Sequence, residues 1–498
     1  MAELLPHFVN GRSEIAPADA EKLILEEPAT GEQYLTVPFA GKDEINAAVS
    51  VAREAFPAWC DTPVVERARI LFRYRQILEA ETDALMEMVS HDHGKTQADA
   101  RGEVQRGIEV VEFACGMPTL MQGAALPDVA RGIDCRSIRQ PLGVCVGITP
   151  FNFPVMVPMW MFPVAIAAGN TFILKPSERV PRAAVRLAEL FKEAGLPNGV
   201  FNVVHGGREA VDALISHPEV RAVSFVGSEP VAREIYRKAG EFGKRVQALS
   251  GAKNHLVVMP DCNMEKTVEG IMGGAYGSAG ERCMAVSVVV AVGEAGDALV
   301  ENLVQAAGAL TLGSGSDPAS EMGPLISKAH KERVLRLIGQ GVEEEAELAL
   351  DGRKHPMAAA PGNYLGASLF DRVAPEMSIY REEIFGPVLG IVRAKNLDEA
   401  IGVINSNPYG NGTAIFTNSG AAARKFQNEV TVGMVGINVP VPVPLAFFPF
   451  SGRKSSFFGD LHVHGRDGVN FYTESKIITT RWHEGDLPGG KNMTITLG

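Results

Sequence analysis

Cys283 is the residue of this chain best suited by its type and neighbours to act as a nucleophile. It lies in the stretch 276–290, YGSAGERCMAVSVVV, directly after Arg282. A nearby cation favours the thiolate, which is the nucleophilic form of cysteine. The small residues at 277–280 would let a ligand or another backbone segment come close. The alternative is an inert core cysteine, because free cysteines are often buried. Periodicity does not decide whether the apolar run 286–290 is a strand or a helix end.

Asn152 offers an amide group that could stabilise negative charge. It lies in TPFNFP, residues 149–154, where two prolines restrict the backbone after an apolar run. A rigid amide N–H suits the oxyanion that forms when a nucleophile adds to a carbonyl. The alternative is an asparagine that hydrogen-bonds its own turn.

Two further segments place polar groups where strands are expected to end. LKPSE, residues 174–178, carries Lys175 and Glu178, which could bind a ribose diol. A carboxylate there would repel the extra phosphate of NADP and favour NAD. A surface ion pair is the alternative. In SFVGS, Gly227 and Ser228 could offer N–H groups and a hydroxyl to a pyrophosphate. Neither segment contains a GxGxxG fingerprint.

Glu383 and Phe385 occur in EEIFGPVL, residues 382–389, just before a Gly-Pro turn. They could contact a ligand at the end of the preceding segment, or they could simply mark a helix end followed by a strand. Taken singly, each of these motifs is weak, so the elements that would bring them together decide their meaning.

An alternation of strands and helices runs from about residue 133 to 259, after a helical region that includes 44–59, 66–90 and 102–113. Strands alternating with helices predict right-handed βαβ units and a doubly wound sheet with ligands at the carboxyl ends of its strands. A second αβ region extends to about residue 450. Its expected strands are 287–292, 368–373, 387–392, 413–417 and 434–439.

Bulk properties narrow the class of protein. With 498 residues the chain is long enough for two or three domains. Its net charge of −12, without a run of like charges, gives no nucleic-acid footprint. Six cysteines without a CxxC pair argue against a disulfide framework or zinc site and favour a reducing compartment. The N-terminus lacks a basic and apolar export signal, so we expect a cytoplasmic protein. We also expect no bound metal.

The uncharged stretch 140–174 is long enough to cross a bilayer, but it contains five prolines and two asparagines. A segment facing lipid cannot leave so much backbone unpaired. We therefore expect an interior stretch of strand, loop and helix at a site, with no membrane partner.

Together, TPFNFP, LKPSE, SFVGS, GERC and EEIFGP occur in the order typical of the aldehyde dehydrogenase superfamily, which the chain resembles over nearly its whole length. The strings PFNFPVMVPMWMFPVAIAAGNTFILKPSER, SGAKNH, GSAGERCMA, VPVPLAFFPFSG and KSSFFGDLHVHG resemble its methylmalonate-semialdehyde dehydrogenase branch. This branch uses NAD and CoA to convert methylmalonate or malonate semialdehyde to propionyl-CoA or acetyl-CoA.

The resemblance implies an α/β aldehyde dehydrogenase-like fold with two doubly wound domains and a small β ribbon for oligomerisation, in a homodimer or homotetramer. The implied boundaries are 1–121 with 144–254 for NAD binding, 255–454 for catalysis, and 122–143 with 470–498 for the ribbon and tail.

The resemblance also assigns roles to residues. It implies Cys283 as nucleophile and Asn152, with the Cys283 N–H, as oxyanion hole. It implies Arg106 and Arg282 for the substrate carboxylate. Cofactor contacts are implied for Phe151, Lys175, Glu178, Gly227, Ser228, Glu383 and Phe385.

One departure from the broad superfamily bears on the reaction. Hydrolytic members carry a glutamate general base in a LELGGK string, whereas the matching string here is ALSGAK, with Leu249 at the position of the glutamate. A leucine cannot take a proton from water, so an acyl-enzyme should persist until a thiol such as CoA arrives. A hydrolytic aldehyde dehydrogenase and a non-enzymatic nucleotide-binding protein are the alternatives.

Overall fold

The computed structural model describes residues 3–481. The larger of its two main β-sheets has eight strands. Its order is β22 (Phe457–Phe458), β12 (Arg245–Leu249), β11 (Val220–Val226), β8 (Val144–Ile148), β9 (Thr171–Lys175), β10 (Phe201–Val203), β2 (His7–Val9) and β3 (Arg12–Glu14). The strands from β12 to β10 are parallel, and the antiparallel strands lie at the edges. From β8 the chain order proceeds to β9 and β10 on one side and to β11 and β12 on the other. Such a switch point forms a crevice at the carboxyl edge.

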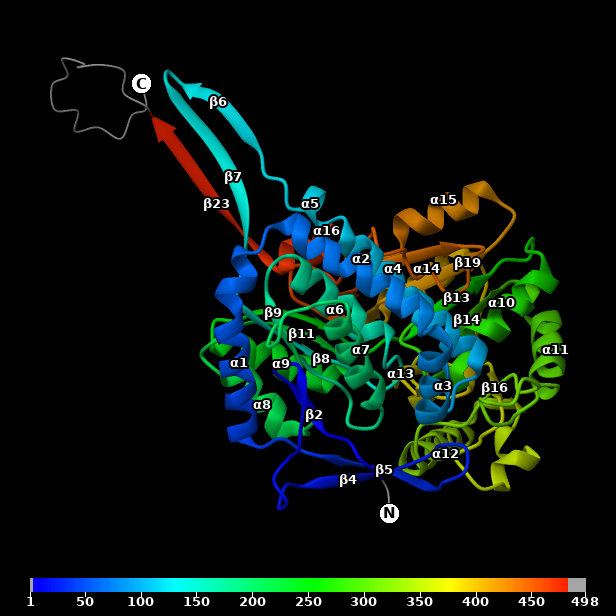
Figure 1. Cartoon of the computed structure of the whole chain (residues 1–498). Helices are drawn as coiled ribbons and strands as arrows, with labels where there is room; N and C mark the ends of the chain where they lie inside the picture. The colour runs from blue at the N-terminus through cyan, green and yellow to red at the C-terminus, as the bar shows by residue number, and fades with distance from the viewer. Residues whose placement is uncertain (1–2, 482–498) are drawn as a thin grey trace, which may run out of the picture.

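Helices cover both faces of this sheet (Figure 1). One face packs against α1 (Lys42–Asp61), α8 (Arg208–Ser216) and α9 (Glu229–Glu241). The other face packs against α2 (Val64–Ala80), α4 (Gln97–Cys115), α6 (Met156–Ala167) and α7 (Arg182–Glu193). The doubly wound arrangement predicted from the alternating pattern is therefore confirmed.

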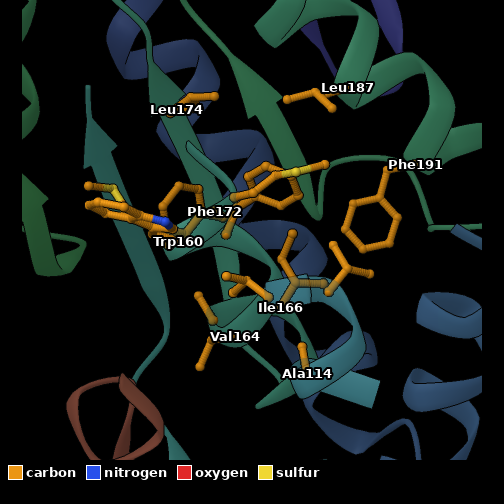
Figure 2. Packing of buried hydrophobic residues seen from close by; sticks show 14 of the residues in the cluster. Ala114, Trp160, Val164, Ile166, Phe172, Leu174, Leu187 and Phe191 are labelled. Carbon is orange, nitrogen blue, oxygen red and sulfur yellow. The ribbon is translucent and has the colours of Figure 1, made fainter. Parts of the chain in front are cut away.

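The uncharged stretch 140–174 forms the interior of this half. It contains β8, α6 and β9, and every residue of α6 is buried. Figure 2 shows Trp160, Val164 and Ile166 of α6 packed among Phe172 of β9 and Phe191 of α7. A helix that is apolar on all sides belongs in a core of this kind. Among residues 3–481, no helix combines the length and apolar character that crossing a bilayer requires.

A seven-stranded sheet organises the other half. Its order is β15 (Glu347–Leu350), β16 (Ser368–Asp371), β17 (Val388–Ala394), β14 (Val286–Val292), β13 (Asn254–Val258), β19 (Gly412–Phe416) and β20 (Met434–Ile437). All of its pairings except β15 with β16 are parallel. The apolar run after Cys283 is thus a central strand, as expected of a Val-rich segment buried on both faces. β13 continues the first alternation in sequence but belongs to this second sheet.

A three-stranded ribbon projects from the body (Figure 1). It consists of β6 (Ala125–Ala130), β7 (Ile133–Pro141) and β23 (Thr473–Arg481). β7 and β23 pair antiparallel from Thr473↔Pro141 to Arg481↔Ile133. The two segments that resemblance assigned to a ribbon therefore lie side by side, while its role in oligomerisation stays a prediction. The expected C-terminal tail, 482–498, lies outside the described residues.

Several details differ from the sequence expectations. The strand β12 and the helix α16 (Gly465–Phe471) were not predicted, and α4 begins at Gln97 rather than near residue 102. The stretch 133–150, expected as one strand region, divides into β7 and β8 in different sheets. The helices α10 (Met264–Tyr276), α11 (Ala295–Gly308) and α15 (Gly420–Glu429) were also not predicted. The proposed domain boundaries stay a prediction.

The other elements are short or peripheral. They are β1 (Glu3–Leu4), β4 (Lys22–Glu26), β5 (Gln33–Pro38), α3 (Thr82–His93), α5 (Met117–Leu120), α12 (Lys328–Glu343), α13 (Ser378–Arg381), α14 (Leu397–Ser406), β18 (Tyr409–Gly410) and β21 (Arg453–Lys454).

Candidate active site

A cavity of about 500 Å³ opens between the two main sheets and contains Cys283. Its wall brings together seven residues predicted from the sequence: Phe151, Asn152, Gly227, Ser228, Cys283, Glu383 and Phe385. They come from the loop after β8, the β11–α9 junction, the turn before β14 and the segment before β17. Residues separated by more than 230 positions in sequence therefore share one cavity. Cys283 and Asn152 both line it, as a nucleophile and an oxyanion donor must.

Cys283 lies in a tightly held turn. Its carbonyl oxygen accepts hydrogen bonds from the side-chain amides of Asn254 (2.9 Å) and Asn411 (3.1 Å). Five residues earlier, Ser278 and Ala279 have φ values of 54° and 52°. Non-glycine residues rarely adopt this left-handed region unless their surroundings impose it. The turn is thus held in one shape by contacts from several elements.

The surroundings of Cys283 disfavour its thiolate form. Burial raises its pKa to about 12, with a further contribution from the Glu383 carboxylate, and Arg282 opposes this only weakly. Arg282 does lower the pKa of Cys283, as expected of a nearby cation, but its effect is smaller than that of burial. Desolvation disfavours the charged form, and here it outweighs the neighbouring cation.

Glu383 lines the same cavity as Cys283 and lies next to the ALSGAK segment. Its carboxylate accepts the N–H of Ala252 at 3.0 Å. Burial raises the pKa of Glu383 to about 7, although that hydrogen bond and Lys253 pull it down. Phe385 has a φ of 58° and meets the ring of Phe151 edge to face, with ring centroids 5.8 Å apart. Two aromatic rings therefore border the pocket near this carboxylate.

The β11–α9 junction brings a helix N-terminus to the cavity wall. Ser228 is the extended residue before the first turn of α9, so free N–H groups of the helix point towards it. A Cβ atom at Gly227 would lie 2.4 Å from the ring of Phe225. A side chain at position 227 would therefore collide with the Phe225 ring, so the packing of this loop requires glycine.

Lys175 and Glu178 lie at the same sheet edge but do not line the cavity wall. β9 pairs with β8 up to Ile148↔Lys175, and Lys175 Nζ donates to Glu178 at 3.1 Å. Burial opposes ionisation of Glu178, but Lys175 and backbone hydrogen bonds outweigh it and lower its pKa. A negative carboxylate thus stands at the carboxyl end of the strand next to β8.

Arg106 and Arg282 are also absent from the wall of the 500 Å³ cavity, although Arg282 and Cys283 together line a smaller cavity of about 20 Å³. Arg106 donates to Glu109 (2.9 Å) and to the carbonyl oxygens of Val443 (3.1 Å) and Pro444 (3.2 Å). Arg282 pairs with Asp99 and lines a second cavity, of about 760 Å³, beside α10. Arg106 belongs to α4 and Arg282 approaches it, and each arginine pairs with an acidic residue of that helix.

Sequence reasoning missed several residues of the cavity wall. The Tyr409 hydroxyl donates to Glu229 at 2.7 Å, which ties β18 to the start of α9. His330 Nε2 donates to the carbonyl oxygen of Phe385 at 2.6 Å. No motif singled these residues out, since each reaches the site from a loop or helix end far away in sequence.

Comparisons with known proteins agree with this geometry. The model of the aldehyde dehydrogenase family matches residues 15–478. A malonate-semialdehyde dehydrogenase from Geobacillus thermodenitrificans is 54% identical over 477 residues, covering 96% of this chain and 99% of that protein. One from Halalkalibacterium halodurans is 52% identical, with 96% and 99% coverage.

Solved structures show the same relationship. A methylmalonate-semialdehyde dehydrogenase from Oceanimonas doudoroffii superposes with a TM-score of 0.95 at 48% identity, covering 97% of this chain and 99% of that one. A Sinorhizobium meliloti protein assigned to the same activity and complexed with NAD gives a TM-score of 0.96 at 48% identity, with the same coverage. On its sequence match and its fold, the chain belongs to the aldehyde dehydrogenase family.

Proposed function

We propose that this protein is an NAD-dependent, CoA-acylating dehydrogenase of malonate semialdehyde, methylmalonate semialdehyde or both. The observation that carries the proposal is Leu249, a buried leucine at the end of β12 where hydrolytic relatives have their general base. The names of the relatives at 52 to 54% identity support the same substrate class.

Cys283 and Asn152 perform the first step. The proton of the Cys283 thiol passes to solvent, and the sulfur adds to the aldehyde carbon, which gives a thiohemiacetal oxyanion. The Asn152 side-chain amide and the N–H of Cys283 are the proposed donors to that oxygen. Donors that are already in place need no reorganisation as the charge develops.

NAD, when bound, supplies the hydride acceptor that turns the thiohemiacetal into a thioester. The donor set of this chain fits such a dinucleotide. We assign the diphosphate to Gly227 and Ser228, the adenosine ribose to Lys175 and Glu178, and the nicotinamide ribose to Glu383. Phe151 and Phe385 border the nicotinamide end. The charge of Glu178 disfavours a 2′-phosphate and hence NADP.

The thioester is then transferred. Malonate semialdehyde, NAD⁺ and CoA thiol give acetyl-CoA, CO₂ and NADH; methylmalonate semialdehyde gives propionyl-CoA in the same way. The bond between the α-carbon and the carboxylate breaks, and the α-carbon gains a proton. The acyl group passes from Cys283 to the CoA sulfur. Arg106 and Arg282 are the proposed partners of the carboxylate before it is lost, because guanidinium groups bind carboxylates in two-point geometry.

The assembly and the compartment belong to the same proposal. The ribbon of β6, β7 and β23 supports a homodimer or homotetramer, and cysteine usage supports a reducing, cytoplasmic setting.

The decisive experiment mixes enzyme and NAD⁺ rapidly with malonate semialdehyde, with and without CoA. We expect NADH to form as a burst of about one equivalent per active site and then stall until CoA is added. Steady NADH formation without CoA would indicate a hydrolytic enzyme. No NADH with any semialdehyde or simple aldehyde would contradict the dehydrogenase assignment.

A further inference from the structure

A buried ion pair lies beneath the loop that carries Asn152. Lys95 Nζ and Glu103 Oε2 are 2.7 Å apart, and both side chains are fully inaccessible to solvent. Removing two charges from water is costly, and an apolar pair of similar volume is often as stable or more stable. The pair is therefore weak evidence for stability, and its other contacts indicate what it does.

Those contacts hold both ends of the segment 152–156. Lys95 Nζ donates to the carbonyl oxygen of Asn152 at 2.6 Å and lies 4.2 Å from the ring centre of Phe153. The second oxygen of Glu103 accepts the N–H groups of Val155 (2.8 Å) and Met156 (3.2 Å) at the start of α6. One ion pair thus fixes the peptide of Asn152 and the helix that follows.

Lys95 is itself held firmly. It follows Gly94, the left-handed residue (φ 91°) at which α3 ends. The carbonyl oxygen of Lys95 accepts a hydrogen bond from the Ser90 hydroxyl at 2.8 Å. A Cβ atom at Gly315 would lie 2.1 Å from that carbonyl oxygen. A segment of the second half of the chain therefore packs directly against the backbone of Lys95. The lysine has little freedom to follow a shift of the loop.

The Asn152 side chain depends on this support. Asn152 is only 3% exposed, so its side chain is enclosed by neighbouring residues. The enclosed side chain can move only together with its backbone, which Lys95 and Glu103 hold at Asn152 and at residues 155 and 156. A donor displaced by about 1 Å can lose about 100-fold in rate.

We propose that Lys95 and Glu103 are positioning residues that act through Asn152 to place its amide at the oxyanion. The proposal rests on the proposed function, in which Asn152 stabilises the thiohemiacetal. It makes the buried charges part of the catalytic apparatus, although neither of them touches the substrate.

A double-mutant cycle tests this proposal. The variants are Asn152→Ala, Lys95→Met and their combination, and the readout is the rate of the NADH burst with semialdehyde and saturating NAD⁺. We expect Asn152→Ala to lose about 100-fold or more. The burst rate of Lys95→Met should fall by at least about 10-fold. The burst rate of the combined variant should equal that of Asn152→Ala within about threefold, because the effects of residues that act as a unit do not add.

Two controls separate positioning from general stability. Tyr74→Phe removes a buried hydrogen bond to the Leu187 carbonyl (3.1 Å) and should lower Tm without slowing the burst. Arg101 lies on the same helix as Glu103 and forms an exposed ion pair with Asp83. Arg101→Met removes this pair and should change neither Tm nor the burst rate. If Lys95→Met does not fold, Lys95→Met with Glu103→Leu replaces the pair by apolar side chains and enters the same cycle.

The outcomes are distinct. Losses that multiply in the combined variant, or a folded Lys95 variant with the wild-type burst rate, would overturn the positioning role and leave the proposed function intact. A wild-type burst in Asn152→Ala would remove the oxyanion assignment and the positioning role together. If the wild-type enzyme forms no NADH, this result would instead contradict the proposed function.

Discussion

Arg282, the neighbour of the nucleophile, is tied by an ion pair to Asp99 at the start of α4. The second oxygen of Asp99 accepts the N–H of Ser278 at 3.0 Å, within the left-handed part of the Cys283 turn. One carboxylate thus holds both the arginine and the turn. Arg106, two helical turns further along α4, is paired with Glu109 in the same way. A substrate carboxylate would have to share both guanidinium groups with these acids.

Replacing Arg282 or Arg106 by leucine should separate carboxylate recognition from catalysis. Loss of a charge-assisted hydrogen bond costs about 1.5–3 kcal/mol, so we expect kcat/KM for malonate semialdehyde to fall by about 10- to 150-fold. Propanal, which has no carboxylate, should lose less than about threefold. Steady-state kinetics on both aldehydes would measure the ratio, and equal losses would remove the carboxylate role.

Asp99→Asn should have the opposite effect on substrate affinity. The asparagine can still accept the N–H of Ser278, but it no longer neutralises Arg282. Since a partly exposed ion pair contributes up to about 1 kcal/mol, we expect KM for the semialdehyde to fall by up to about fivefold, with propanal unchanged. A higher KM for the semialdehyde alone would show that Asp99 instead aims the guanidinium.

The pKa of Cys283, raised to about 12 by burial, predicts slow alkylation of the free enzyme. A raised pKa means less thiolate at every lower pH, so reaction with iodoacetamide should accelerate about tenfold per pH unit from pH 7 to 9.5. Mass spectrometry of the peptide containing Cys283 would follow the rate, and Cys283→Ser would give the background from the other cysteines. A plateau between pH 7 and 8 would contradict the raised pKa.

Leu249→Glu should make the enzyme partly hydrolytic. Leu249 is 5% exposed and belongs to the apolar cluster against which Cys283 packs. A carboxylate there could take a proton from water, so NADH formation without CoA should continue beyond the burst. Leu249→Gln has a similar volume but is not a base, and it should still stall. Continued turnover in both variants would show that solvent access, and not a base, limits hydrolysis.

Glu178→Gln should relax the choice of cofactor. The ionised Glu178 beside Lys175 is expected to repel the 2′-phosphate of NADP, and the amide would not. We expect kcat/KM with NADP⁺ to rise about tenfold, while NAD⁺ loses its ribose contact and falls. Glu189→Gln, on the exposed side of α7, serves as the matched control. An unchanged NADP⁺ to NAD⁺ ratio would place the discrimination elsewhere.

The fold class, the order of the motifs and the groups that could react were all predicted from the amino-acid pattern alone. Strand and helix periodicities are local, so the alternation from β8 to β11 could be recognised before any contact was known. The uncharged stretch around α6 was correctly assigned to the interior because its prolines and asparagines exclude a lipid environment. Cys283 and Asn152 stood out because few residue types can be a nucleophile or an uncharged oxyanion donor.

The pKa values of these groups and the contacts that hold them depend on residues that meet only in the folded chain. The pKa of Cys283 depends on the atoms that exclude water from it, and Arg282, adjacent in sequence, is directed to Asp99 instead. β12 and α16 gave no clear local signal, since long-range packing defines them. Lys95 and Glu103 are near each other in sequence but reach Asn152 across a gap of more than 45 residues. Desolvation and hydrogen bonding act through space, so their partners emerge only when the chain is folded.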